Sequence, residues 1–439
     1  MDQAASARRD ANCWFGLAIG ALALAGVLAI VLVIGRVPAL GFSSSGVDFA
    51  RRSLVVHVDL AVGVWFFAFL AALFCLLPGA ARGRWVPFAA IVSGCGVVTF
   101  ALPIASRTAS PVLSNYVPVL DHGLFLAGLV LFAIGVSASF LDRRLVSDAD
   151  HRSVIPPEAR PGIRIAAFAF LIAMATIVVA YVTRDPSAPA LPRFERLFWG
   201  GGHVLQTSEA IAMLAAWLIL LDRVTGRSAM SPRFATIVFG AMLIPTLFAP
   251  ALALGAEPSP WFTTMMELGI APGVAVVVWR GIAVLRQRKT HVNLRSPAMI
   301  GLAVSVVMTL IGFVFGAAIS TNTTLVPAHY HMNIGAVTVT FMTLLVALAP
   351  TFGAPVRNPR LACWQPVIYG IGQTLFATGL GVAGFWGHAA RKVYDHEPQL
   401  GTHVEHGGLI LAGIGGVIAM AGGVLFFIVI IRAWTQRRR

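Results

Sequence analysis

Long apolar runs separated by short polar segments dominate this chain. Windows of about 19 residues mark twelve runs, and each is long enough to cross the hydrocarbon layer of a membrane as one helix. A spanning backbone has to satisfy its own hydrogen bonds, so the pattern predicts an all-α, polytopic membrane protein. We expect residues 1–439 to form one transmembrane domain, a bundle of twelve spans. Their approximate limits are 14–35, 53–77, 86–106, 119–140, 163–183, 197–221, 234–255, 261–284, 298–320, 330–353, 365–387 and 407–431.

Basic residues then give the direction of the spans. With twelve spans, 23 of the 32 Lys and Arg residues fall in segments on one side of the membrane and nine on the other. Because basic loops stay in the cytoplasm, this asymmetry predicts that both termini are cytoplasmic. The expected location is the cytoplasmic (inner) membrane of a bacterium, in contact with lipid.

Composition narrows the possible classes of protein. Apolar residues make up 58% of the chain and charged residues 11%, and the mean hydropathy is +0.83. These values exclude a soluble enzyme or a disordered chain. The net charge of +14 is read as a topology signal, so no nucleic-acid partner is expected. The four cysteines show no paired spacing, which gives no support for a disulfide framework or a thiolate metal site.

Histidines gather at one predicted depth of the bundle. Polar side chains inside a bilayer are costly and are functional candidates by default. Neutral imidazole is a common ligand of haem iron and of copper, so a shared layer of metal ligands is one interpretation. The alternative is that each of these histidines simply lies at the boundary of membrane and water. The six residues, from the outer ends of five spans, are His57, His122, His203, His329, His331 and His388.

His329 and His331 stand two residues apart on one predicted helix. Residues at i and i+2 point about 200° apart on a helix, so these two rings cannot bind the same metal ion. They can reach two different cofactors on opposite sides of the helix, which suits a helix placed between two haems. Two interfacial histidines without a ligand are the alternative.

Three short stretches resemble a known family. The stretch 328–337, AHYHMNIGAV, resembles helix ten of the catalytic subunit I of the heme–copper oxidase superfamily, which includes terminal oxygen reductases and nitric oxide reductases. The stretch 384–394, GFWGHAARKVY, resembles the end of helix eleven of that subunit. The stretch 199–203, WGGGH, resembles the start of its helix six. The resemblance follows the order of the spans along the whole chain.

The resemblance implies a role for several residues. His57 and His331 would be the axial ligands of a low-spin haem, and His329 the axial ligand of a high-spin haem. Arg391 and Lys392 would pair with haem propionates. Two haems are therefore expected, and side-chain ligands do not encode the haem type.

One part of the family pattern is missing. The family carries a histidine on helix six and a histidine pair on helix seven for a second, non-haem metal, but the span 234–255 contains no histidine. His203 is left alone, and a single imidazole cannot hold copper firmly. Glu267 is a candidate second ligand for a rebuilt copper or non-haem iron site, with a structural hydrogen bond as the alternative. Thr207 stands where some oxygen reductases have a tyrosine that donates hydrogen.

These observations favour a respiratory oxidoreductase subunit. Electrons would come from a cytochrome c-type donor or partner subunit outside, and would pass from the low-spin haem to a high-spin haem that binds O2 or NO. The alternative is a haem protein without turnover, namely a gas sensor, an electron relay or an assembly factor that has lost the copper site. A transporter with a histidine-lined outer pocket is a third possibility, and it predicts no haem.

Overall fold

The computed structural model describes residues 3–34, 44–79, 85–146, 153–255, 259–287, 293–389 and 402–436. Within these residues the fold is almost entirely helical, with one small antiparallel hairpin. The described part of the chain contains twelve helical segments that are long and apolar enough to cross a membrane, and each overlaps one of the twelve predicted spans. The predicted all-α, twelve-span fold is confirmed.

Four helices begin before the apolar windows at residues whose polar side chains cap the first turn. The hydroxyls of Ser231, Ser296 and Thr402 each accept a hydrogen bond from the backbone N–H three residues later. The side chain of Asn358 does the same. Such caps satisfy backbone donors that have no partner in the first helical turn.

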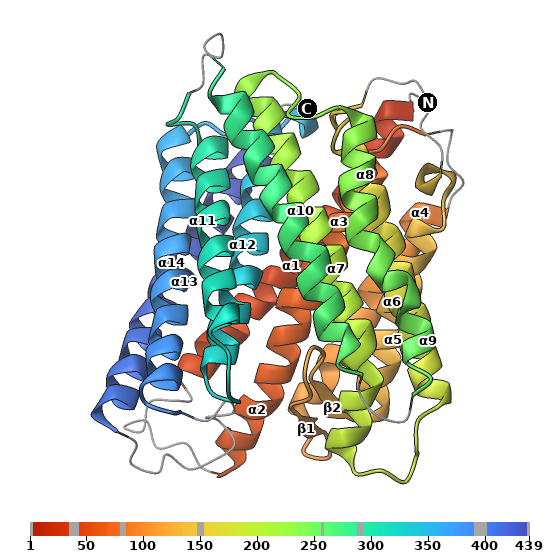
Figure 1. Cartoon of the computed structure of the whole chain (residues 1–439), viewed down its shortest axis with the longest axis vertical. Coiled ribbons are helices and arrows are strands. Elements are labelled where there is room, and N and C mark those ends of the chain that lie inside the picture. Colours follow the sequence, from red (N-terminus) through yellow and green to blue (C-terminus); the bar gives the residue numbers. More distant parts are fainter. Residues whose placement is uncertain are drawn as a thin grey trace. The chain divides into compact units, whose positions relative to one another are not determined.

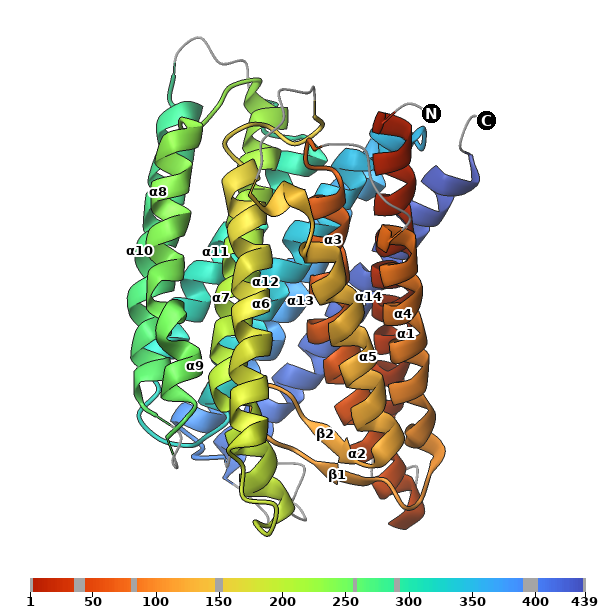
Figure 2. The same ribbon diagram turned by 90° about the vertical axis from the view of Figure 1, so that its right-hand side faces the viewer.

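The helices gather into two compact units, and the single transmembrane domain expected for residues 1–439 stays a prediction. Unit 1 comprises residues 1–218 and 228–283, and unit 2 comprises residues 219–227 and 284–439. Most elements belong to unit 1 (Figures 1 and 2), and the ends of α7 and α10 belong to unit 2. These elements are α1 (Gln3–Ile34), α2 (Ser44–Val58), α3 (Trp65–Cys75), α4 (Trp85–Ala101), β1 (Ser110–Val112), β2 (Val119–Asp121), α5 (Gly123–Phe140), α6 (Arg160–Val182), α7 (Ala190–Thr225), α8 (Pro232–Leu243), α9 (Ala249–Leu252) and α10 (Trp261–Leu285).

Four long helices form most of unit 2, and Figure 1 shows them side by side. The last two of these helices meet at small residues. Gly372 of one helix lies against the backbone of Ala419 of the other, and Gly379 lies against the backbone of Ala412. Small residues let membrane helices approach closely where lipid gives no hydrophobic driving force. The four helices are α11 (Pro297–Ala317), α12 (Leu325–Leu348), α13 (Pro359–Phe385) and α14 (His403–Thr435).

Three spans of unit 1 depart from regular α-helix in the part of the chain that the structure describes, and one of these departures is the 3-10 turn Leu102–Ala105 that ends the span after α4. A π-helical turn, Asp59–Val64, joins α2 to α3 in one continuous span. A 3-10 turn, Ile244–Phe248, separates α8 from α9. Pro245 opens that turn, and its missing N–H and its ring prevent regular α-helical bonding. No such residue explains the π-helical turn, and turns of this kind are frequent at functional sites.

The hairpin lies at the end of unit 1 opposite the N-terminus of α1, beside α2 and the beginning of α7 (Figure 2). Ser110 pairs with Asp121 and Val112 with Val119. The intervening loop, residues 113–118, holds its shape through a hydrogen bond from the Ser114 hydroxyl to the carbonyl of Val117. Strand β1 and the loop fall between the third and fourth predicted spans, but β2 occupies the first residues of the predicted span 119–140. The helix of that span begins later than predicted, at Gly123, because the chain is still in the hairpin before His122 caps α5.

Candidate functional site

His57 is the penultimate residue of α2, directly before the π-helical turn. Its Nδ1 lies 2.8 Å from the carbonyl oxygen of Ala25 in α1. A carbonyl can only accept, so Nδ1 carries the proton and the lone pair of the neutral ring is on Nε2. A histidine that binds a metal through one nitrogen commonly donates its other N–H to a backbone carbonyl in this way.

His329 is fixed by a neighbouring helix of unit 2. Its Nδ1 donates a 2.7 Å hydrogen bond to the carbonyl of Gly312 in α11, and the Asn333 amide donates to the carbonyl of His329 at 3.0 Å. Gly316 makes room for the ring, because a Cβ at that position would lie 2.6 Å from Nδ1. The ring is therefore held in one tautomer, with the lone pair on Nε2.

His331 faces a different neighbour. Its ring packs edge-on against Phe376 of α13, with the ring centroids 4.7 Å apart. His329 bonds to α11 instead. The two rings of the His-x-His pair thus diverge, as the helical geometry required.

Arg391 and Lys392, the predicted propionate partners, lie outside the described residues. The described segment before them ends at Ala389. The carbonyl of Ala389 accepts a 2.9 Å hydrogen bond from the backbone N–H of Thr324. Thr324 is the residue before α12, five positions before His329. Nearby, Gly384 lies against the backbone of Leu325 in α12. The end of α13 is therefore tied to the beginning of the histidine-bearing helix.

His203 is fully buried in the middle of α7. Its Nδ1 donates to the carbonyl of Trp199 at 2.7 Å, which leaves Nε2 as the acceptor. The hydroxyl of Tyr116 donates to Nε2 at 2.7 Å, and the Thr263 hydroxyl lies 3.4 Å from the same atom. Both ring nitrogens of His203 are thus engaged within unit 1.

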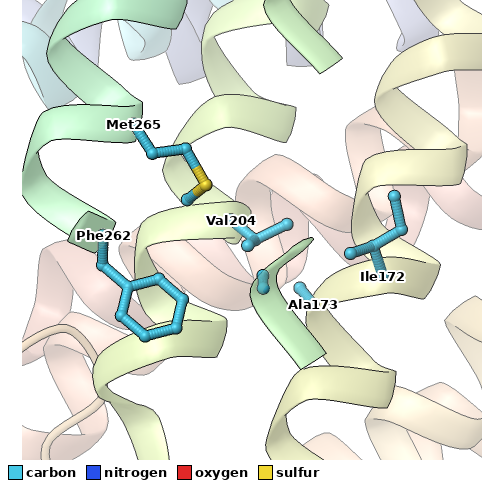
Figure 3. Close-up of a cluster of buried hydrophobic side chains, with 6 residues drawn as sticks. Ile172, Ala173, Val204, Phe262 and Met265 are labelled. Atoms are coloured by element: carbon cyan, nitrogen blue, oxygen red, sulfur yellow. The ribbon is translucent and has the colours of Figure 1, made fainter. Parts of the chain in front are cut away.

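Aromatic rings enclose this histidine. The Tyr116 ring centroid lies 4.4 Å from that of His203, the Trp199 centroid 4.9 Å, and Phe262 stacks at 5.8 Å. Phe262 also belongs to a cluster of buried apolar side chains next to the histidine, which includes Val204 (Figure 3). His203 is therefore shielded from water.

The three glycines before His203 each admit a different neighbour. A Cβ at Gly200 would lie 2.6 Å from the Phe262 ring, and one at Gly202 would overlap Cβ of Tyr116. Gly201 likewise faces α6. Glycine inside a helix costs about 1 kcal/mol relative to alanine, so these glycines are explained by close approach.

The residues present do not fit a second metal at His203. Glu267, the predicted second ligand, is exposed, whereas His203 is fully buried with Nε2 bonded to Tyr116. No group of three or more His, Cys, Asp or Glu side chains suited to a metal ion occurs among the described residues. Among the described residues, no hydrogen bond or ion pair joins Glu267 to His203.

Another of the six outer histidines, His122, has a local role, and two further histidines lie in the first turn of α14. His122 precedes α5, and its Nδ1 accepts a hydrogen bond from the N–H of Leu124, which caps that helix. His403 and His406 are exposed in the first turn of α14, and Nδ1 of His406 bonds to the carbonyl of Thr402. These contacts do not require a ligand.

Tyr116 is the site residue that sequence reasoning missed. It has φ of 68°, in the left-handed region that is uncommon for a residue with a side chain. Its position 87 residues before His203 gives no hint of contact. The available signal was the run of glycines before His203, which indicates close approach by some neighbour.

Comparison with known proteins identifies a family and two relatives. Residues 11–432 match the family described as Cytochrome C and Quinol oxidase polypeptide I. An uncharacterized protein of Aquifex aeolicus (strain VF5) is 26% identical over 336 residues, which cover 75% of this chain and 83% of the relative. An uncharacterized protein of Rickettsia prowazekii (strain Madrid E) is 22% identical over 497 residues, which cover 95% of this chain and 94% of the relative.

Proposed function

Because the chain belongs to the cytochrome c and quinol oxidase polypeptide I family, we propose that it is a haem-binding oxidoreductase subunit of a membrane. Electrons pass from a low-spin haem to a high-spin haem that binds O2 or NO. A cytochrome c-type protein or a partner subunit donates the electrons on the outer side of a bacterial cytoplasmic membrane. Members of this family typically bind haems.

The observation that carries the proposal is the state of the His329 ring. Its Nδ1–H is held by the carbonyl of Gly312, and Gly316 leaves space where a side chain would displace the ring. Among the described residues of unit 2, no hydrogen bond to Nε2 of His329 competes with a metal. A preorganised imidazole of this kind suits an axial haem ligand.

The chain's own residues have separate tasks in this proposal. His329 would hold the high-spin haem, which would supply gas binding and one-electron redox chemistry. His57 and His331 would hold the low-spin haem. The Ala25 carbonyl orients His57, and Phe376 packs against His331. Arg391 and Lys392 pair with propionates, because guanidinium and ammonium groups offset buried carboxylate charge.

Spectra of substituted proteins test these assignments. We expect His57→Ala and His331→Ala each to remove the low-spin bands from the reduced-minus-oxidised spectrum and to leave the high-spin haem. A low-spin spectrum that survives either substitution contradicts the pairing. The control is His122→Ala. The His122 ring caps α5, so its removal should leave both haems in place.

A haem protein without turnover is the second candidate, and one observation favours it. Tyr116 occupies the nitrogen of His203 that a second metal would use. A chain with two haems and no second metal would serve as an electron relay or a gas sensor. Steady consumption of O2 or NO by the purified protein, with a reduced cytochrome c as donor, distinguishes the oxidoreductase from this alternative.

A further inference from the structure

Among the described residues, three polar side-chain contacts join the hairpin of unit 1 to α7. Asp121 pairs with Arg193 at 3.0 Å and the Asn115 amide donates to Glu195 at 3.2 Å. The Tyr116 hydroxyl donates to His203 at 2.7 Å. The first and last of the α7 partners, Arg193 and His203, lie ten positions apart, which is about 15 Å along the helix. The hairpin is therefore fastened along α7 and not only at one point.

Two features of the backbone are shaped to admit Tyr116. The tyrosine itself adopts the left-handed conformation, with φ of 68°. On the other side, Gly202 offers hydrogen in place of a Cβ that would overlap the tyrosine. A non-glycine residue with positive φ and a glycine inside a helix are each unfavourable on their own, so their meeting indicates a built contact.

The contact uses up the hydrogen-bonding capacity of the histidine. The Trp199 carbonyl accepts from Nδ1–H, and the Tyr116 hydroxyl donates to Nε2. A metal ion needs the lone pair on Nε2, and it needs further donors that the surrounding aromatic rings do not supply.

We propose that the hairpin 110–121 is a clasp that replaces the second metal of this family with a tyrosine–histidine pair. The clasp seals His203 inside unit 1 through Tyr116, and the contacts of Asp121 and Asn115 hold it closed. His203 is then a structural residue and not a metal ligand. This inference does not depend on the haem ligands, and it extends the proposed function by assigning a different role to the family's helix-six histidine.

Metal binding tests the replacement directly. Purified protein and the His203→Ala variant are incubated with copper, passed through a desalting column and analysed for copper and for total iron. Haem iron is measured separately from the haem spectrum, so a loss of haem is not mistaken for a loss of the second metal. We expect equal copper and equal non-haem iron in the two proteins. One equivalent of either metal that disappears with His203 overturns the proposal.

Chemical modification tests the clasp. Diethylpyrocarbonate modifies accessible imidazole nitrogens, and mass spectrometry of peptides locates the modified residue. We expect His203 in the native protein to react at least about tenfold more slowly than the exposed His406, because the nitrogen becomes available only on local opening. Equal rates at the two histidines overturn the proposal.

Two variants open the clasp from different sides. Gly202→Ala places a methyl group against Tyr116, and Arg193→Ala removes the ion pair to Asp121 without touching the tyrosine or the histidine. Both should raise the modification rate of His203, with the larger increase for Gly202→Ala. The control Gly94→Ala lies where a Cβ meets no atom within 4 Å, and it should change nothing. His203 that stays protected in both opening variants contradicts a clasp. If Gly202→Ala does not fold, Arg193→Ala decides alone.

Discussion

His203 of unit 1 and His329 of unit 2 have the same type of partner at Nδ1 and differ at Nε2. In both, Nδ1–H donates to a backbone carbonyl at 2.7 Å, which places the lone pair on Nε2. A tyrosine hydroxyl then takes Nε2 of His203, whereas no described residue of unit 2 bonds to Nε2 of His329. A glycine leaves space at each site. Gly202 admits the Tyr116 side chain beside His203, and Gly316 admits the His329 ring.

Under the proposed function, the partner of the second ring nitrogen separates a metal ligand from a structural histidine. A fixed tautomer is common to metal ligands and to structural histidines, so it does not distinguish them. What distinguishes them is whether the chain itself satisfies the remaining lone pair. The family position alone would have assigned both residues to metals.

Alanine substitutions at the two histidines should give the largest difference in the haem spectra. We expect His329→Ala to abolish the carbon monoxide difference spectrum of the high-spin haem, because His329 is the one protein ligand that the proposed function gives that haem. His203→Ala should leave both haem spectra nearly intact. Loss of a haem from the His203 variant would show that the two residues have the same role.

Substitution of Gly316 by alanine sharpens the account of His329. The new Cβ would lie 2.6 Å from Nδ1, so the ring has to shift away from the Gly312 carbonyl. Loss of an outer partner of a metal ligand typically weakens affinity about 10–100-fold, and we expect high-spin haem to be lost to apomyoglobin faster by a factor in that range. Gly413→Ala, where a Cβ meets no atom within 4 Å, is the matched control, and equal rates for the two variants would contradict this account.

Substitution of Gly202 by alanine tests the corresponding contact at His203. Overpacking of a closely packed site costs about 1–3 kcal/mol, and we expect the free energy of unfolding in denaturant to fall by that amount. The haem spectra should not change. A variant as stable as the native protein would mean that Tyr116 is not held against α7.

Removal of one hydroxyl should have the smallest effect. Tyr116→Phe keeps the ring against His203 and Trp199 but deletes the donor to Nε2. A hydrogen bond of this kind contributes about 1 kcal/mol net, so the free energy of unfolding should fall by about that much. Tyr181→Phe, at an exposed residue of α6, is the control. A Tyr116→Phe variant indistinguishable from this control would remove the hydroxyl from the account.

The sequence predicted the spans well because hydrophobic length is a local property. Each predicted window overlaps one helical segment, and the differences lie at the ends. The α7 helix, for example, begins at Ala190 and not at residue 197. Its first residues are helical but lie outside the apolar window, so hydrophobicity alone does not mark them. The divergence of His329 and His331 was also predictable, since it follows from helical geometry alone.

Contacts between distant segments were not predictable in the same way. Nothing in the loop 113–118 indicates that Tyr116 adopts a left-handed conformation or reaches His203. The π-helical turn after His57 likewise has no local cause such as a proline. Both depend on packing between elements, and periodicity carries no information on that packing.

The haem content of the purified protein tests the central claim most directly. A reduced-minus-oxidised spectrum, with haem quantified per polypeptide, should show two haems, one of which responds to carbon monoxide. A colourless protein that folds and assembles in the membrane would contradict the account.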